Sequence, residues 1–205
     1  MNYITTYCHI ALNNCYVNGK LTHSFNSNSI DDFTKEFYKS LILEYPKFHK
    51  MDRLAKTAFL GTEVLKKECP EILNYKDDEI AILFSNNNSS ALTDVNFQTS
   101  YQNGGVPSPS LFVYTLPNIL IGEIAIRNKW YGENMFTVAE HFDAEYFVNY
   151  CNVLLHKNAA AALCGWLTID DNKIEAFLFF VTKKDFNELN LPLESKQLIE
   201  LYTKN

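Results

Sequence analysis

The sequence predicts an α/β protein with a mainly parallel sheet of five strands covered by helices. Runs of β-forming residues alternate with segments of helical periodicity, in the order β-α-β-α-β-α-β-β. The run 79–84 (EIAILF) does not alternate between polar and apolar residues, which is typical of a strand buried on both faces. The last two strands, 160–169 and 174–181, flank a polar turn and are expected to form a hairpin that adds an antiparallel edge strand.

The first part of the chain has its own strand and helix signals. Residues 7–12 predict the first strand, and Asn18-Gly19 predicts a hairpin turn between 15–17 and 21–23. Apolar residues at helical spacing predict a helix over 31–43. Asp52 is expected to cap a second helix that Pro70 ends, and Gly61 in its middle indicates close approach to another element.

Composition fits one globular domain over residues 1–205 and argues against several classes of function. Apolar residues make up 47% of the chain, which suffices for a sizeable core. A net charge of −6 disfavours nucleic-acid binding, because no basic stripe is visible to neutralise phosphates. The apolar runs are too short for a membrane helix, and no secretory signal is evident, so a cytoplasmic location is expected. The five scattered cysteines are interpreted as reduced thiols in the core.

The stretch 108–141 contains the most informative pattern of the chain. Pro117 suits the first turn of a helix whose apolar residues repeat at helical spacing, namely Leu120, Ile121, Ile124 and Ala125. Tyr131-Gly132 breaks this helix, and 135–139 is interpreted as a short buried strand. Glu140 and His141 follow, before another helix from residue 142 onward. This order of strand, sharp turn and helix is where many α/β enzymes present a nucleophile to the positive end of a helix.

This stretch, with the residues before it, resembles the N-terminal half of the β-ketoacyl synthases, which are condensing enzymes with a thiolase-type fold. The matching residues, in order, are Lys50-Met51-Asp52, Gly104-Gly105, Ser108-Pro109, Thr115-Leu116-Pro117-Asn118 and Gly132. The resemblance covers about two thirds of the chain. It implies half of a thiolase-like fold, and the C-terminal half of the family fold is expected to be absent from this chain.

The resemblance also implies that the chain does not catalyse condensation. In the family, an acyl-accepting cysteine follows the strand, and that position falls on His141 here, with Glu140 as its neighbour. The histidines that complete the family's active site belong to the C-terminal half. No cofactor is expected, and no cysteine or histidine spacing indicates a metal site. We interpret the side chain of His141 as one that fills the turn.

A ketosynthase relative without the cysteine resembles a chain length factor, which pairs with an active, full-length β-ketoacyl synthase. The resemblance implies a heterodimer formed through the strand Met135, Phe136, Thr137 and Val138. It also implies an apolar wall for the growing acyl chain, for which an ordinary core segment is the alternative, built from Leu111, Phe112, Val113, Tyr114 and Leu116. The reduced form resembles subunits of aryl polyene or flexirubin-type pathways. Acyl carrier protein would be met indirectly, through the ketosynthase.

Two other functions remain open on the sequence. Glu140 and His141 would serve a stand-alone enzyme acting on an acyl thioester, with neutral His141 as a general base. A homodimeric module that binds acyl groups or docks a carrier protein is the second. The net negative charge disfavours carrier docking, since carrier proteins are themselves acidic.

Overall fold

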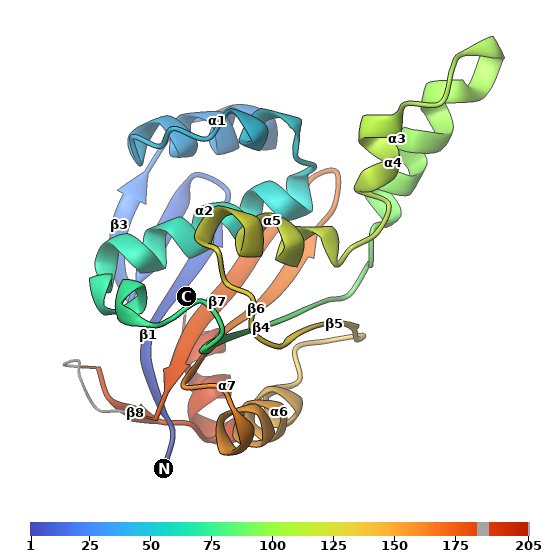
Figure 1. The fold of residues 1–205 in the computed structure, drawn as a ribbon. Coiled ribbons are helices and arrows are strands. Elements are labelled where there is room, and N and C mark those ends of the chain that lie inside the picture. The colour runs from blue at the N-terminus through green and yellow to red at the C-terminus, as the bar shows by residue number, and fades with distance from the viewer. Residues whose placement is uncertain (184–188, 205) are drawn as a thin grey trace.

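A computed structural model describes residues 1–183 and 189–204. One mixed sheet forms its centre, in the order β3-β2-β1-β7-β6-β4-β5, and β8 pairs with the N-terminal end of β1 (Figure 1). The strands are β1 (Tyr3–Ala11), β2 (Asn14–Val17), β3 (Lys20–Ser24), β4 (Ile80–Asn86), β5 (Asn134–Val138), β6 (Ala161–Ile169), β7 (Ile174–Thr182) and β8 (Leu191–Pro192).

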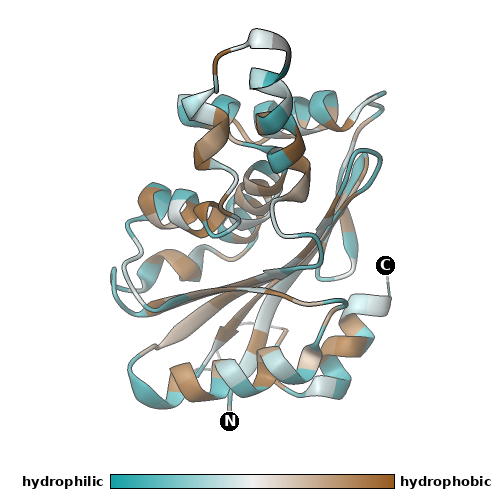
Figure 2. Ribbon diagram, turned by 90° about the vertical axis from the view of Figure 1, so that its right-hand side faces the viewer, coloured by the Kyte–Doolittle hydropathy of each residue, from teal (hydrophilic) through white to brown (hydrophobic). Residues whose placement is uncertain are grey.

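Helices cover both faces of this sheet, so the α/β class is confirmed. One face is covered by α1 (Ile30–Ser40), α2 (Arg53–Glu68) and α5 (Ile119–Asn128), and the other by α6 (Ala144–Lys157) and α7 (Ser195–Thr203) (Figures 1 and 2). Each face has its own buried apolar cluster, and residues of the central strands alternate between the two. The sheet is therefore the wall between two cores.

The expected sheet of five mainly parallel strands is wrong in its details. The described residues form eight strands, and parallel pairing joins β4 to β5 and to β6, whereas the other pairs are antiparallel. The hairpin β2–β3 extends the sheet beyond β1. β7 is not an edge strand, because it lies between β6 and β1 with nearly every side chain buried. Its apolar composition suits that central place.

Local signals in the sequence are confirmed at several places. Asp52 caps α2, since its carboxylate accepts a hydrogen bond from the backbone N–H of Ala55 at 2.8 Å. Gly61 faces β7, where a Cβ atom would lie 2.8 Å from a methyl group of Leu178. This glycine lets α2 lie close to the sheet. Pro117 precedes the first residue of α5 by two positions and is not inside that helix.

An arm of two helices extends from the body at the carboxyl end of β4. It consists of α3 (Ala91–Tyr101), the short 3₁₀ helix η3 (Gln102–Gly104) and α4 (Pro109–Val113), and the chain returns from it into α5 (Figure 1). Thr93 is the one buried residue described in α3, and α4 has none among the described residues. The arm therefore belongs to neither of the two cores. Two further 3₁₀ helices, η1 (Pro46–Lys50) and η2 (Pro70–Asn74), flank α2.

Candidate functional site

The predicted nucleophile turn is a connection of five residues between β5 and α6. Asp143 caps α6, because its carboxylate accepts a hydrogen bond from the N–H of Tyr146 at 2.9 Å. His141 lies two residues before this cap and is exposed, as is Glu140. The helix N-terminus is thus closed by Asp143, and the expectation that His141 fills the turn is wrong. The five-residue connection leaves the side chain of His141 exposed to solvent.

The polar loop that follows β4 closes on itself through one asparagine. Asn86 is buried; its Nδ2 donates to the carbonyl of Ser89 at 2.7 Å, and its Oδ1 accepts from the N–H of Ser89 at 2.9 Å. Ser89 has a φ of 51°, a conformation that these two bonds hold in place. Ser90 then donates to the carbonyl of Thr115 at 2.6 Å. The loop fixes where the arm leaves and re-enters the body.

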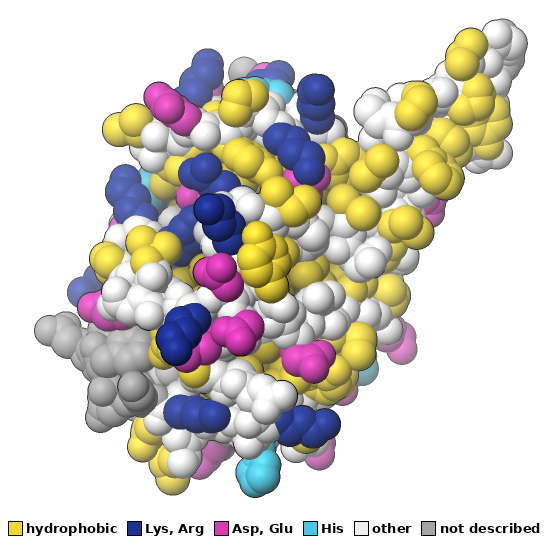
Figure 3. Space-filling view, in the orientation of Figure 1, with side chains coloured by type: hydrophobic (Ala, Val, Ile, Leu, Met, Phe, Trp, Pro, Cys, Tyr) yellow, Lys and Arg dark blue, Asp and Glu magenta, His cyan; other side chains and the backbone are white. Residues whose placement is uncertain are grey.

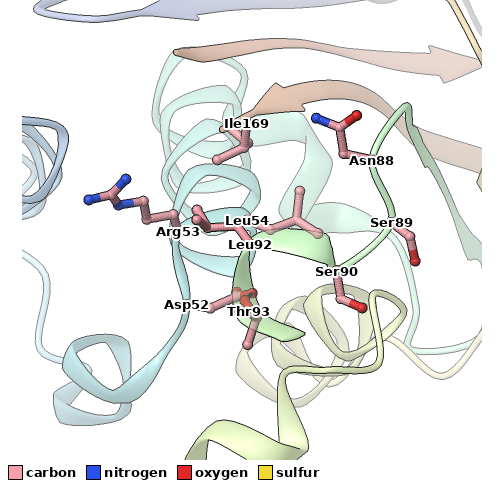
Figure 4. A pocket seen from close by; sticks show the side chains of 9 residues that line it. All are labelled: Asp52, Arg53, Leu54, Asn88, Ser89, Ser90, Leu92, Thr93 and Ile169. Atoms are coloured by element: carbon pink, nitrogen blue, oxygen red, sulfur yellow. Dashed lines mark hydrogen bonds between the residues drawn. The ribbon is translucent and has the colours of Figure 1, made fainter. Parts of the chain in front are cut away.

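Asp52 ties the arm to α2. Besides capping α2, its carboxylate accepts a hydrogen bond from the hydroxyl of Thr93 in α3 at 2.7 Å. Burial raises the pKa of Asp52, and the hydrogen bonds from Ala55 and Thr93 oppose that rise. The two side chains meet in a narrow cavity, while Arg53 points away from them (Figure 4). Arg53 instead donates to the carboxylate of Asp31. This arrangement is structural, and its effect is to set the root of the arm.

The arm exposes several large apolar side chains. Inside it, the ring of Phe97 lies 5.3 Å from that of Tyr101 and 5.4 Å from that of Phe112, measured between centroids. Apolar side chains gather along the arm in the space-filling view (Figure 3). Large apolar residues of this region whose side chains are exposed are Val95, Tyr101, Val106, Phe112, Val113 and Leu116. A surface of this kind on a projecting element indicates a contact with another molecule.

The residues of the predicted tunnel wall do not all face the same way. Phe112, Val113 and Leu116 are exposed, by 57%, 44% and 54%, and Leu111 is half-buried. Tyr114 instead turns inward, where its hydroxyl donates to Oε1 of the buried Glu123 at 3.0 Å. The sequence did not indicate this hydrogen bond to Glu123, because Tyr114 lies in an apolar run. Tyr114 therefore anchors the arm to α5 and does not face outward.

β5 lies at the edge of the sheet, so the interpretation of 135–139 as a buried strand is wrong. Its inner side pairs with β4 in parallel, from Ile82 opposite Asn134 to Asn86 opposite Val138. Among the described residues no strand pairs with its outer side. Met135 and Val138 are exposed by 38% and 54%, whereas Phe136 packs against the α2 side of the core. An apolar edge strand without a partner is a ready site for pairing with another chain.

The five cysteines lie in the two apolar cores. All five cysteines are buried, which confirms their interpretation as core thiols. Cys151 of α6 and Cys164 of β6 touch, with 3.3 Å between their sulfurs, and burial raises the pKa of Cys164. No helix of the described ranges has the length and apolarity needed to span a bilayer.

Comparison with known proteins bears on the fold. No family model and no curated protein matches the sequence. Solved structures do match. A ketosynthase in complex with its chain length factor from Xenorhabdus doucetiae aligns with a TM-score of 0.59 and 13% identity, over 89% of this chain and 79% of that one. The ishigamide ketosynthase/chain length factor aligns with a TM-score of 0.63 and 16% identity, over 92% of this chain and 63% of that one. The chain has a ketosynthase-like, thiolase-like fold.

Two further solved structures share the likeness. A β-ketoacyl synthase from Burkholderia phymatum aligns with a TM-score of 0.52 and 9% identity, over 89% of this chain and 59% of that one. A type II ketosynthase in complex with its acyl-carrier protein aligns with a TM-score of 0.59 and 9% identity. The chain spans about three fifths of the length of three of these four structures. At such identities the likeness establishes the fold.

Proposed function

We propose that this chain is a non-catalytic, ketosynthase-like subunit of the chain-length-factor type. It pairs with an active, full-length β-ketoacyl synthase and shapes the tunnel that holds the growing acyl chain. The observation that supports this most is that one chain carries two open surfaces, the outer edge of β5 and the exposed apolar side chains of the arm. They occur on a fold whose solved neighbours include complexes of a ketosynthase with its chain length factor.

In this proposal β5 pairs with the equivalent strand of the ketosynthase, and the arm reaches the partner's acyl tunnel. Pairing would cover the exposed side chains of Met135 and Val138 and satisfy the outer backbone groups of the strand. Phe112, Val113 and Leu116 then form the wall that limits chain length. Acyl carrier protein delivers substrate to the ketosynthase. An aryl polyene or flexirubin-type pathway is the setting proposed for this complex.

The absence of catalysis by this subunit is part of the proposal. No cysteine lies between Gly132 and Asp143, where the family would place its nucleophile. His141 and Glu140 are exposed and form no hydrogen bond within the described residues, so nothing orients the imidazole as a general base. A stand-alone acyl-thioester enzyme predicts that His141→Ala abolishes product formation. The proposed function predicts that the same variant leaves product yield unchanged.

Product length tests the wall directly. Phe112→Trp enlarges an exposed side chain at the end of α4 and should shorten the acyl chains that the reconstituted complex makes, because the tunnel loses volume. Ile199→Trp, at a similarly exposed position on α7, is the matched control and should leave chain length unchanged. Mass spectrometry of the extracted products measures both. Products of unchanged length with Phe112→Trp, in a complex that still assembles, would remove the tunnel-wall role.

A further inference from the structure

Ile42 adopts a conformation that its side chain opposes. It directly follows Leu41, the C-terminal cap of α1, and its φ is 56°, in the left-handed region. This position after a helix usually holds glycine, and a β-branched residue there is a marked outlier. The N–H of Ile42 donates to the carbonyl of Lys39 at 3.0 Å, which closes the helix end. A residue poorly suited to its backbone therefore stands where glycine would relieve the strain.

The same side chain is almost fully exposed. Ile42 has 88% of its surface open to solvent, so neither core gains from its apolar atoms. Burial thus gives no reason for isoleucine here, and the backbone gives a reason against it. Strained residues of this kind gather at functional positions. The combination indicates that the apolar side chain is used in contact with another molecule.

The stretch of chain that contains this residue is rich in lysine. η1 packs on the end of α1, where the rings of Tyr38 and Phe48 stack at 4.2 Å and the Tyr38 hydroxyl accepts from the N–H of Tyr45 at 2.6 Å. These contacts hold η1 against α1, and we call residues 39–50 the Ile42 segment. It contains three lysines, one exposed glutamate and an exposed histidine: Lys39, Lys47, Lys50, Glu44 and His49.

Two of these lysines have no acidic partner within the described part of the chain. Lys47 forms an ion pair with the buried Glu123 at 2.9 Å, whereas Lys39 and Lys50 are exposed and form no ion pair there. The net charge of the whole chain, −6, therefore conceals a lysine-rich segment that also bears the exposed side chain of Ile42. Such a segment complements an acidic protein surface that has a small apolar hollow.

We propose that the Ile42 segment docks an acyl carrier protein, with Ile42 inserted into an apolar hollow and Lys39 and Lys50 against acidic side chains. The choice of carrier protein rests on the proposed function, which brings this small acidic protein to the complex. One projecting isoleucine is too little apolar surface to hold a membrane, which takes a broad apolar face. Nucleic acid would use the lysines and leave the isoleucine exposed.

Binding of purified carrier protein to the full chain, without any ketosynthase, tests the docking surface. Titration of fluorescently labelled carrier protein by anisotropy should show saturable binding that weakens as salt rises. Ile42→Gly should weaken binding at least about tenfold, because the variant removes the apolar side chain that fills the hollow. The same variant should melt at an equal or higher temperature, because glycine accepts the left-handed backbone. A better folded protein that binds less well excludes unfolding as the cause.

Charge reversal and a distant control complete the test. Lys39→Glu with Lys50→Glu should weaken carrier binding and remove its salt dependence, and Ile199→Ala, on the opposite face of the sheet, should leave it unchanged. Absent carrier binding, unchanged affinity in Ile42→Gly, or binding to vesicles of anionic lipid in place of carrier protein would overturn the docking proposal. A ketosynthase complex that forms normally in Ile42→Gly shows that such a failure concerns docking alone.

Discussion

His9 shows how one buried side chain joins the first strand to the last helix. Its ring is stacked on that of Phe177, with centroids 4.5 Å apart, and its Nε2 lies 3.0 Å from the carbonyl oxygen of Leu201 in α7. Burial lowers the pKa of His9 to about 4, and the hydrogen bond to Leu201 and the charge of Glu175 oppose this without reversing it. The folded protein therefore holds the neutral imidazole.

This pKa predicts the direction in which acid acts on stability. The unfolded chain takes up the proton near pH 6.5 and the folded chain near pH 4, so the free energy of unfolding should fall as pH drops between these values. At about 1.4 kcal/mol per pKa unit, the loss amounts to at most about 3 kcal/mol. Urea unfolding at pH 7.5 and pH 4.5 measures it. His9→Gln should lose less stability over this interval, and an equal loss in both proteins would contradict the assignment.

Residues that act within a few positions of the chain were predictable, and residues with distant partners were not. Asp52 as a helix cap and Gly61 as a close approach follow from propensity and spacing, and the structure confirms both. The second bond of Asp52, to Thr93, joins positions far apart in the chain and left no local signal. In the sequence, Tyr114 groups with its apolar neighbours for the same reason. Its partner Glu123 comes close to it only in the folded state.

At the scale of elements, the contact of β4 with β6 depends on one glycine. Gly165 of β6 stands opposite Phe84 of β4, and a Cβ atom on Gly165 would overlap the buried phenylalanine ring. Gly122 of α5 offers a matched control, since a Cβ atom there meets nothing within 4 Å. Comparing the same substitution at these two glycines therefore distinguishes a packing requirement from ordinary helix propensity.

Alanine at these two positions should act in opposite directions. Gly165→Ala should destabilise the protein by at least about 2 kcal/mol, because an overpacked core displaces its neighbours. Gly122→Ala should stabilise it by up to about 1 kcal/mol, through the better helix propensity of alanine. Thermal and urea unfolding of both variants measure the difference. A Gly165→Ala protein as stable as the original would show that the strands do not approach as closely as described.

The order of elements was predictable, but their arrangement in the sheet was not. Periodicity located most of the strands and the helices α1, α2, α5 and α6 to within a few residues, and the hairpin at Asn18-Gly19 follows from its turn residues. Periodicity carries no information on which strands pair, so the central place of β7 and the edge position of β5 were missed. The edge position of β5 agrees with the pairing role that the resemblance implied for this strand.

At the scale of the whole molecule, two open surfaces lie on a body that is otherwise well packed. The arm starts at the carboxyl end of β4, and β5 ends beside that point, since β5 pairs with β4 in parallel and Val138 lies opposite Asn86. A partner that pairs with β5 therefore meets a chain whose arm is rooted beside it. The average charge of the chain concealed the lysines of the Ile42 segment, because composition does not record position.

Assembly with a ketosynthase tests the central claim most directly. The chain would be co-expressed with full-length β-ketoacyl synthases, purified through a tag on one partner, and sized by light scattering. We predict a stable one-to-one complex with condensation activity that neither chain has alone. Met135→Lys with Val138→Lys should abolish it by charging the edge strand, while Ile199→Lys should not. A well-folded chain that stays alone or forms a homodimer with every ketosynthase present would contradict the account.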